Sequence, residues 1–389
     1  MTDLMKTRRL RPVAVAGPIL ASTGFVIELT TVPLLLTFIQ ADFGLSLAQL
    51  TWVFNIYAAA VAAAVLAGGW LGDLLGNRRI FVIGALLFAL GSCGVALAET
   101  YAGLLAARLA QGAGGGLFSP LVPVLLTGAT PNRPGRILIL WGSLAGFVAA
   151  FAPLAGSAVI ALAGWQTLFW AIALFGLLAL GFAPALPRAV RDEDHAPRLP
   201  DLRRLIGAGR LWCVFVYVFC TYGAISFFFF DLPLEIDAAG LPPRFTGLVL
   251  AALWLSFAIA GAMMRNAVDG RLLLPITLSG PVLILGGVVL ALWPFGPAAY
   301  LLGAMALGVG FACTNAPSTQ LVLRFAPEGL RAISTSLDIT FARLGGVLSV
   351  ALLAKHGPGF VAQGIAVLTV LALIAAILCV HLSVRRKRP

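Results

Sequence analysis

The composition of this 389-residue chain excludes a soluble protein. Hydrophobic residues make up 60% of the chain and charged residues 11%, whereas soluble proteins carry roughly 25% charged and about 45–50% apolar residues. So few charges cannot cover the surface of a globule this size, and so apolar a chain is not a disordered one. The formal net charge of +11 would indicate nucleic acid for a soluble domain. Here the charges gather between long apolar runs, so we expect a polytopic membrane protein with no nucleic-acid partner.

Twelve apolar runs are each long enough to cross a bilayer, for which a helix needs about 20 residues. They cover residues 13–39, 47–71, 80–98, 101–125, 137–161, 165–187, 210–235, 243–265, 272–293, 298–323, 332–354 and 358–383. The sequence therefore predicts an all-α integral membrane protein with twelve transmembrane helices.

The basic residues predict the orientation of these helices. Of the 26 lysines and arginines, 22 lie in segments on the same side as the N-terminus. The opposite loops hold only Arg244 and Lys355, while Arg108 and Arg343 lie within apolar runs. Because basic residues concentrate in cytoplasmic loops, both termini are predicted to be cytoplasmic.

One long polar segment, residues 188–209, divides the chain. It contains several prolines and an acidic cluster, so we interpret it as a cytoplasmic linker. The linker would join two bundles of six helices, formed by residues 1–187 and 210–389.

The two halves share landmarks at a nearly constant offset. The pairs, at offsets of 196, 197 and 195 residues, are Asp73 and Asp269, Pro120 and Pro317, and Arg136 and Arg331. A parallel repeat of this kind is typical of transporters whose halves are related by an axis along the membrane normal.

The junction between the second and third runs carries the clearest motif. It reads Gly69-Trp-Leu-Gly-Asp73-Leu-Leu-Gly76-Asn77-Arg78-Arg79 and is similar to the GxLxDxxGRR signature of the major facilitator superfamily. The resemblance implies a conformational latch in which the aspartate pairs with arginines or with a helix N-terminus and favours one access state. Asn77 replaces a residue that is usually basic in this family, so one arm of the latch is weakened.

The fourth run contains Arg108, Gln111 and a glycine-rich stretch, similar to the superfamily's RxxQGxG pattern. An arginine within a span costs roughly 2.5–3.5 kcal/mol on insertion scales, so we expect Arg108 to face a cavity or a partner. The alternative is that its side chain extends to the outer interface.

Two further motifs resemble the drug:proton antiporters of this superfamily. Glu28 in the first run, followed by Trp52 and Tyr57 in the second, is similar to the start of their fourteen-helix branch, although this chain has only twelve runs. Pro153 and Gly156 match a degraded GPxxGG signature associated with exporters. The alternative for this last pair is an ordinary small-residue packing site.

Glu28, Arg108 and Asp231 are the predicted proton-coupling residues. Glu28 lies nearest to the middle of a predicted helix, where lost hydration favours the protonated form of a carboxylate. A pair with Arg108 could switch between states, and the alternative is a static ion pair. For Asp231 the alternative is a solvated residue at the cavity mouth, and for Asp338 we expect packing or gating.

The resemblance implies a cavity between the halves, lined by the first, fourth, seventh and tenth helices. Polar side chains can line such a cavity, but they also hold helices together. The candidate liners are Thr31, Asn55, Gln111, Tyr217, Tyr222, Thr314 and Asn315.

These observations predict a proton-coupled exporter of amphipathic small molecules that works by alternating access. We expect a monomer in the inner (plasma) membrane, with the proton gradient as energy source and no metal or cofactor. The alternatives are a metabolite importer or facilitator of the same fold, or a non-transporting scaffold or intramembrane enzyme. An enzyme is disfavoured because no second catalytic group stands beside Glu28, and a scaffold because it would not need charges deep in the membrane.

Overall fold

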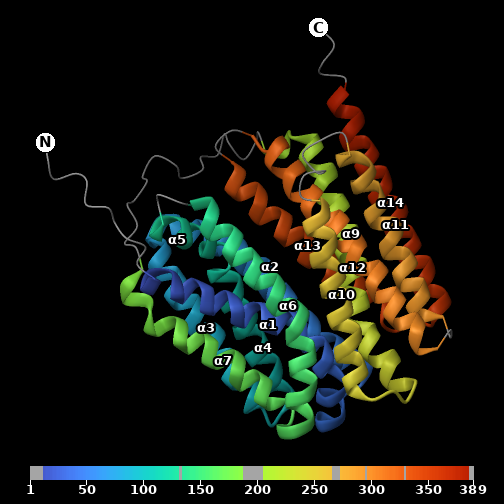
Figure 1. Cartoon of the computed structure of the whole chain (residues 1–389), viewed down its shortest axis with the longest axis horizontal. Helices are drawn as coiled ribbons and strands as arrows, with labels where there is room; N and C mark the ends of the chain where they lie inside the picture. Colours follow the sequence, from blue (N-terminus) through green and yellow to red (C-terminus); the bar gives the residue numbers. More distant parts are fainter. Residues whose placement is uncertain are drawn as a thin grey trace, which may run out of the picture.

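The chain is helical throughout the part that the structure describes. The computed structural model describes residues 12–130, 134–186, 205–264, 272–293, 296–327 and 330–384, and these contain no β-strand. Its helices (Figure 1) are α1 (Pro12–Phe43), α2 (Leu47–Leu75), α3 (Asn77–Ala96), α4 (Tyr101–Phe118), α5 (Leu121–Ala129), α6 (Pro134–Ala163), α7 (Gln166–Gly181), the short 3₁₀-helix η1 (Ala183–Ala185), α9 (Gly209–Ala238), α10 (Pro243–Met264), α11 (Leu273–Leu292), α12 (Pro297–Phe325), α13 (Arg331–Leu353) and α14 (Pro358–Val384).

Each of the twelve predicted runs lies on one of these elements, and ten helices are long and apolar enough to span a membrane. The fourth run is a bent pair, because α4 and α5 meet at an angle of 41°. Pro120 lies between them and cannot continue the hydrogen-bond ladder of α4. The sixth run is shorter than predicted, because α7 has 16 residues and gives way to the proline-containing η1. The all-helical membrane fold is confirmed.

Helix packing divides the described residues into two similar groups, α1–α7 and α9–α14 (Figure 1). In the first group α4 packs against α2 and α3, and α7 packs against α1 and α3. The second group repeats these contacts, with α12 against α10 and α11, and α14 against α9 and α11. This agrees with the repeat in the sequence. Most of the linker, like Asp269, lies outside the described residues, so the domain boundaries stay a prediction.

The glycine-rich stretch of α4 explains how the first half packs so closely. Gly112 lies against the backbone of α2, and Gly114 lies against the backbone nitrogen of Phe88 on α3. Gly115 faces the ring of Phe25 on α1. Small residues at such interfaces let helix backbones approach one another. Three neighbouring helices therefore contact α4 at positions where a larger side chain would not fit.

The two halves meet mainly along two helix pairs, α2 with α13 and α6 with α10. Across the first pair, Asn55 Nδ2 donates to the Val347 carbonyl at 3.0 Å and the Thr340 hydroxyl donates to the Ala62 carbonyl at 3.1 Å. Across the second, Gly247 lies against Pro153 and Ser157. The halves therefore share few polar bonds within the described residues.

Gly114→Ala is expected to lower the free energy of unfolding by about 1–3 kcal/mol, because its new Cβ would overlap the backbone of α3. Gly142→Ala on α6 is the matched control, since nothing lies within 4 Å of a Cβ there. That variant should be neutral or more stable by up to about 1 kcal/mol, because alanine favours helix. Thermal unfolding of the purified full-length protein measures both, and equal melting temperatures would contradict the packing role of Gly114.

Candidate functional site

A cavity of about 500 Å³ lies between the two halves. The helices expected from the sequence, α1, α4, α9 and α12, line it together with α2, α5, α6, α10 and α13. Its walls are largely aromatic, with rings from Phe25, Phe54, Phe118, Trp141, Phe229, Trp254 and Phe311. Apolar walls and this volume are typical of sites for small molecules.

The cavity extends toward one face of the bundle, the face at which α1 begins and α2 ends, which we call the N-terminal face. Ser22 near the start of α1, Thr319 near the end of α12 and Thr335 near the start of α13 all line it. Toward the opposite face the halves are in contact. There the rings of Phe54 and Phe230 are 5.6 Å apart. The structure is therefore closed at the face opposite the N-terminal face.

A buried ion pair joins α1 to α4 at the cavity wall. Arg108 Nη1 donates to Glu28 Oε1 at 2.8 Å, and the side chains are 2% and 1% exposed. The same nitrogen donates to Gln111 Oε1 at 2.6 Å, and Arg108 Nε donates to the Val53 carbonyl at 3.3 Å. The Tyr57 ring lies 4.3 Å from the guanidinium carbon, a distance typical of cation–π contacts. Arg108 therefore faces the pair and the cavity and does not extend to the outer interface.

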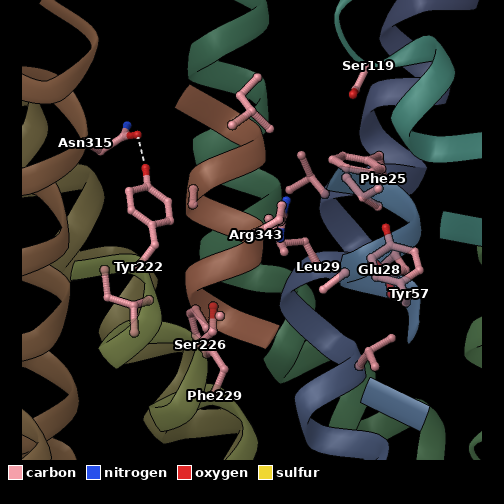
Figure 2. Close-up of a pocket in the computed structure, with 18 of the residues that line it drawn as sticks. Phe25, Glu28, Leu29, Tyr57, Ser119, Tyr222, Ser226, Phe229, Asn315 and Arg343 are labelled. Carbon is pink, nitrogen blue, oxygen red and sulfur yellow. Dashed lines mark hydrogen bonds between the residues drawn. The ribbon is translucent and has the colours of Figure 1, made fainter. Parts of the chain in front are cut away.

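Two oxygen atoms beside this pair have no hydrogen-bond partner. Glu28 Oε2 and the Tyr57 hydroxyl are both buried and unpaired among the described residues. Figure 2 shows the two side chains together on the cavity wall, next to Phe25. Unpaired buried polar atoms cost free energy. The second oxygen of Glu28 therefore lacks the kind of bond that Arg108 gives to the first.

Two of the predicted polar liners lie in the cavity wall. The Tyr222 hydroxyl on α9 donates to Asn315 Oδ1 on α12 at 2.5 Å, and both residues line the cavity. Figure 2 shows this pair on the wall that the second half contributes.

The other five predicted liners are not among the residues that border the cavity, and their polar atoms bond within or between helices. The Thr31 hydroxyl donates to the Ile27 carbonyl, and Asn55 joins α2 to α13. Gln111 Nε2 donates to Ser92 Oγ, and the Tyr217 hydroxyl donates to the Thr277 carbonyl and contacts Thr314. Polar residues in apolar helices often hold helices together, which is the alternative that applies here.

Asp231 does not border the central cavity. It borders a small void with Glu235, Val288 and Ala291, between α9 and α11. Asp231 follows Tyr222 by nine residues, about two and a half helical turns, so the two side chains point to opposite sides of α9.

Two residues that the sequence analysis did not place in the cavity do line it, Asp338 and Arg343 on α13. Arg343 makes no hydrogen bond or ion pair with any described residue, and Asp338 Oδ1 is buried without a partner. They are five residues apart and so do not share one face of the helix, but the cavity borders a wide part of α13. The signal available in the sequence was the presence of charges within a span, which is itself an indication of function.

The predicted latch lies at the N-terminal face, between α2 and α3. Gly76 forms the turn with φ of +95°, a conformation that favours glycine. Asp73 and Arg79 are exposed and Arg78 is half-buried. Asp73 makes no ion pair with another residue in the part of the chain that the structure describes. Gly69 lies on the same helix, facing Ser336 of α13.

The export-type motif lies at a helix contact on α6. The Pro153 carbonyl contacts Gly247 on α10, and Gly156 packs against Thr31 and Leu34 on α1. Both positions therefore contribute to packing, one of them between the two halves.

Removing one member of the Glu28–Arg108 pair is expected to destabilise the protein more than removing both charges. Arg108→Met leaves a buried carboxylate unpaired, which costs about 3–5 kcal/mol. Adding Glu28→Gln should restore part of that loss. Thermal unfolding of the single and double variants measures the coupling, with Arg244→Met, at an exposed arginine, as control. Additive effects of the two substitutions would contradict a coupled pair.

Comparisons with known proteins agree with this architecture. Residues 10–350 match the Major Facilitator Superfamily. The chain is 28% identical to the 3-(3-hydroxy-phenyl)propionate transporter of Escherichia coli (strain K12), over 85% of this chain and 86% of that protein. It is 32% identical to the methylenomycin A resistance protein of Bacillus subtilis (strain 168) over 42% of this chain. That match spans only 36% of the length of the relative.

The fold also resembles solved transporters. A crystal structure of the nucleoside transporter NupG superposes with a TM-score of 0.75 at 12% sequence identity, over 95% of this chain and 99% of that one. An identity this low supports the fold alone. The family match points to a transporter fold and not to an enzyme. The chain belongs to the major facilitator superfamily and is a multi-pass membrane protein.

Proposed function

We propose that this transporter exports amphipathic small molecules in exchange for protons, by alternating access in the inner (plasma) membrane. The observation that carries the proposal is the Glu28–Arg108 pair at the cavity wall. One carboxylate oxygen is held by Arg108 and the other is buried without a partner. A carboxylate in this arrangement can gain and lose a proton, and each change alters its bond to Arg108.

Protonation of Glu28 would couple the proton to the conformation. A neutral Glu28 no longer balances the buried Arg108 charge, and an unbalanced buried charge is costly. A conformation that offers Arg108 another partner or water would then be favoured. A proton arriving from outside and a substrate binding from inside would thus stabilise different states, and the proton gradient would drive export.

The positions of the basic residues support an orientation with the N-terminal face toward the cytoplasm. In that orientation the present structure would be inward-facing, because its cavity extends to the N-terminal face and it is closed at the other. Asp73 has no ion-pair partner among the described residues, which fits a latch that forms only when the cytoplasmic side closes. We propose that the transporter works as a monomer, with both termini cytoplasmic and no metal or cofactor.

The drug-resistance relative supports export of an amphipathic compound, although it matches over less than half of either chain. Import of an organic acid is a second candidate. It is favoured by the 3-(3-hydroxy-phenyl)propionate transporter, because that match covers most of both chains. The direction of movement under an imposed pH gradient separates the two candidates.

Glu28→Gln is expected to abolish proton-driven transport, lowering its rate by more than about tenfold, because the amide cannot exchange a proton. Asp231→Asn is the matched control, a carboxylate of α9 outside the cavity, and it should keep the wild-type rate. Efflux of ethidium and of N-phenyl-1-naphthylamine from energised cells, and pH-gradient-driven uptake into inverted vesicles, measure both variants.

Downhill exchange of dye without a pH gradient should survive in Glu28→Gln, since binding and rocking do not need the proton. Full proton-driven transport by Glu28→Gln would remove Glu28 from the mechanism. Loss of coupling in Asp231→Asn instead would place the proton site on α9.

A further inference from the structure

We propose that Arg343 binds the anionic group of the substrate, so that the cavity selects an aromatic compound carrying a carboxylate or sulfonate. The inference rests on the proposed function only for the location of the binding site, and it holds for either direction of transport. It begins from the charges in the cavity wall. The side chains of Glu28, Arg108, Asp338 and Arg343 all line the cavity.

Only one of the two arginines already has a counter-ion. Arg108 is neutralised by Glu28 at 2.8 Å. Arg343 has no hydrogen bond and no ion pair with any residue that the structure describes, and it is half-buried in the cavity wall. A guanidinium in an apolar cavity needs water or an anion. The cavity therefore presents one unneutralised cation to a ligand.

Asp338 does not fill this role, although it is on the same helix. The two side chains form no ion pair within 4 Å, because five residues along a helix correspond to about 140° around its axis. Asp338 Oδ1 is itself buried without a hydrogen bond. The acid and the base of α13 therefore stay separate in this structure.

Arg343 lies where both halves of the protein can contact the same ligand. Figure 2 shows it between Tyr222 of the second half and Leu29, Glu28 and Tyr57 of the first. A guanidinium can bind a carboxylate or sulfonate through two parallel hydrogen bonds. An anion held here would leave the rest of the ligand between the aromatic walls.

Those walls fit a flat apolar body. In the second half Trp254 stacks on Phe229 with ring centroids 5.6 Å apart and lies 5.8 Å from Phe311. In the first half Phe25 packs edge-on against Phe118 at 5.8 Å. Aromatic rings favour stacked and edge-to-face partners. The combination of ring-lined walls and one unpaired guanidinium matches an aromatic anion better than a neutral compound of the same shape.

A matched pair of fluorescent probes tests this directly. The anion 8-anilinonaphthalene-1-sulfonate and the neutral N-phenyl-1-naphthylamine share one skeleton and differ by the sulfonate. Binding to the full-length protein in zwitterionic nanodiscs, corrected with empty nanodiscs, gives the ratio of the two affinities. We expect the wild type to prefer the anion by at least about tenfold, the usual size of one charge-assisted interaction. Equal affinities, or no binding of the anion, would overturn the proposal.

Arg343→Gln should reduce this ratio to about one, while Arg244→Gln, at an exposed arginine outside the cavity, should leave it unchanged. Arg343→Lys keeps the charge but not the paired geometry, so an intermediate ratio is expected. If Arg343→Gln does not fold, the affinity ratio measured with Arg343→Lys tests the proposal in its place. An unchanged ratio in Arg343→Lys would count against the proposal.

Asp338→Asn tests whether anion binding by Arg343 depends on Asp338. Removing a negative charge from the cavity should raise the affinity for the anion. If Asp338→Asn instead lowers the ratio as much as Arg343→Gln, the two act as a unit and the proposal fails. Because these are equilibrium measurements without a gradient, they are independent of proton coupling. An intact anion preference without proton-driven transport would overturn only the proposed function, and proton-driven transport without the preference would overturn only this inference.

Discussion

The ion pair between Glu28 and Arg108 is the interaction on which the rest of the site depends. Both side chains are almost fully buried, and neither charge could be left alone at that depth without a large cost. The pair therefore holds α1 against α4 only while both groups are charged. Since the cavity borders the same two side chains, a change in the charge of Glu28 alters the electrostatic potential where a ligand would bind.

The packing of the helices determines which parts of the protein can move when the charge of Glu28 changes. Within the first half, glycines of α4 place its backbone against α2 and α3, and close-packed interiors resist deformation. Between the halves, the described polar bonds are few, such as those from Asn55 and Thr340. Relative movement of two rigid halves therefore disturbs less than movement within either half.

Much of the fold and part of the site could be predicted from the sequence. In a membrane, a lone buried charge or an unpaired backbone group costs so much free energy that the sequence must contain the residues that prevent it. That reasoning found the helices, the repeat and the residues of the buried pair. It failed where a helix is apolar on every side, as α9 is. There the pattern does not show which side faces the cavity, so it did not separate Tyr222, which lines the cavity, from Tyr217 and Asp231, which do not. Arg343 was missed for a different reason, since its position within an apolar run does not show by itself that it faces the cavity.

The charge of the substrate and the direction of transport are linked through Arg108. When Glu28 is protonated, the charge of Arg108 is no longer neutralised and attracts anions into the cavity. An anionic ligand at Arg343 would then bind better together with the proton, so an anion preference of the cavity favours the second candidate, import of an organic acid with a proton, over exchange. A neutral or cationic ligand gains nothing from that charge and can be excluded by it, which favours exchange. The first half would thus supply the coupling and the second the recognition, and the sign of the ligand charge would decide whether the same ion pair drives import or export.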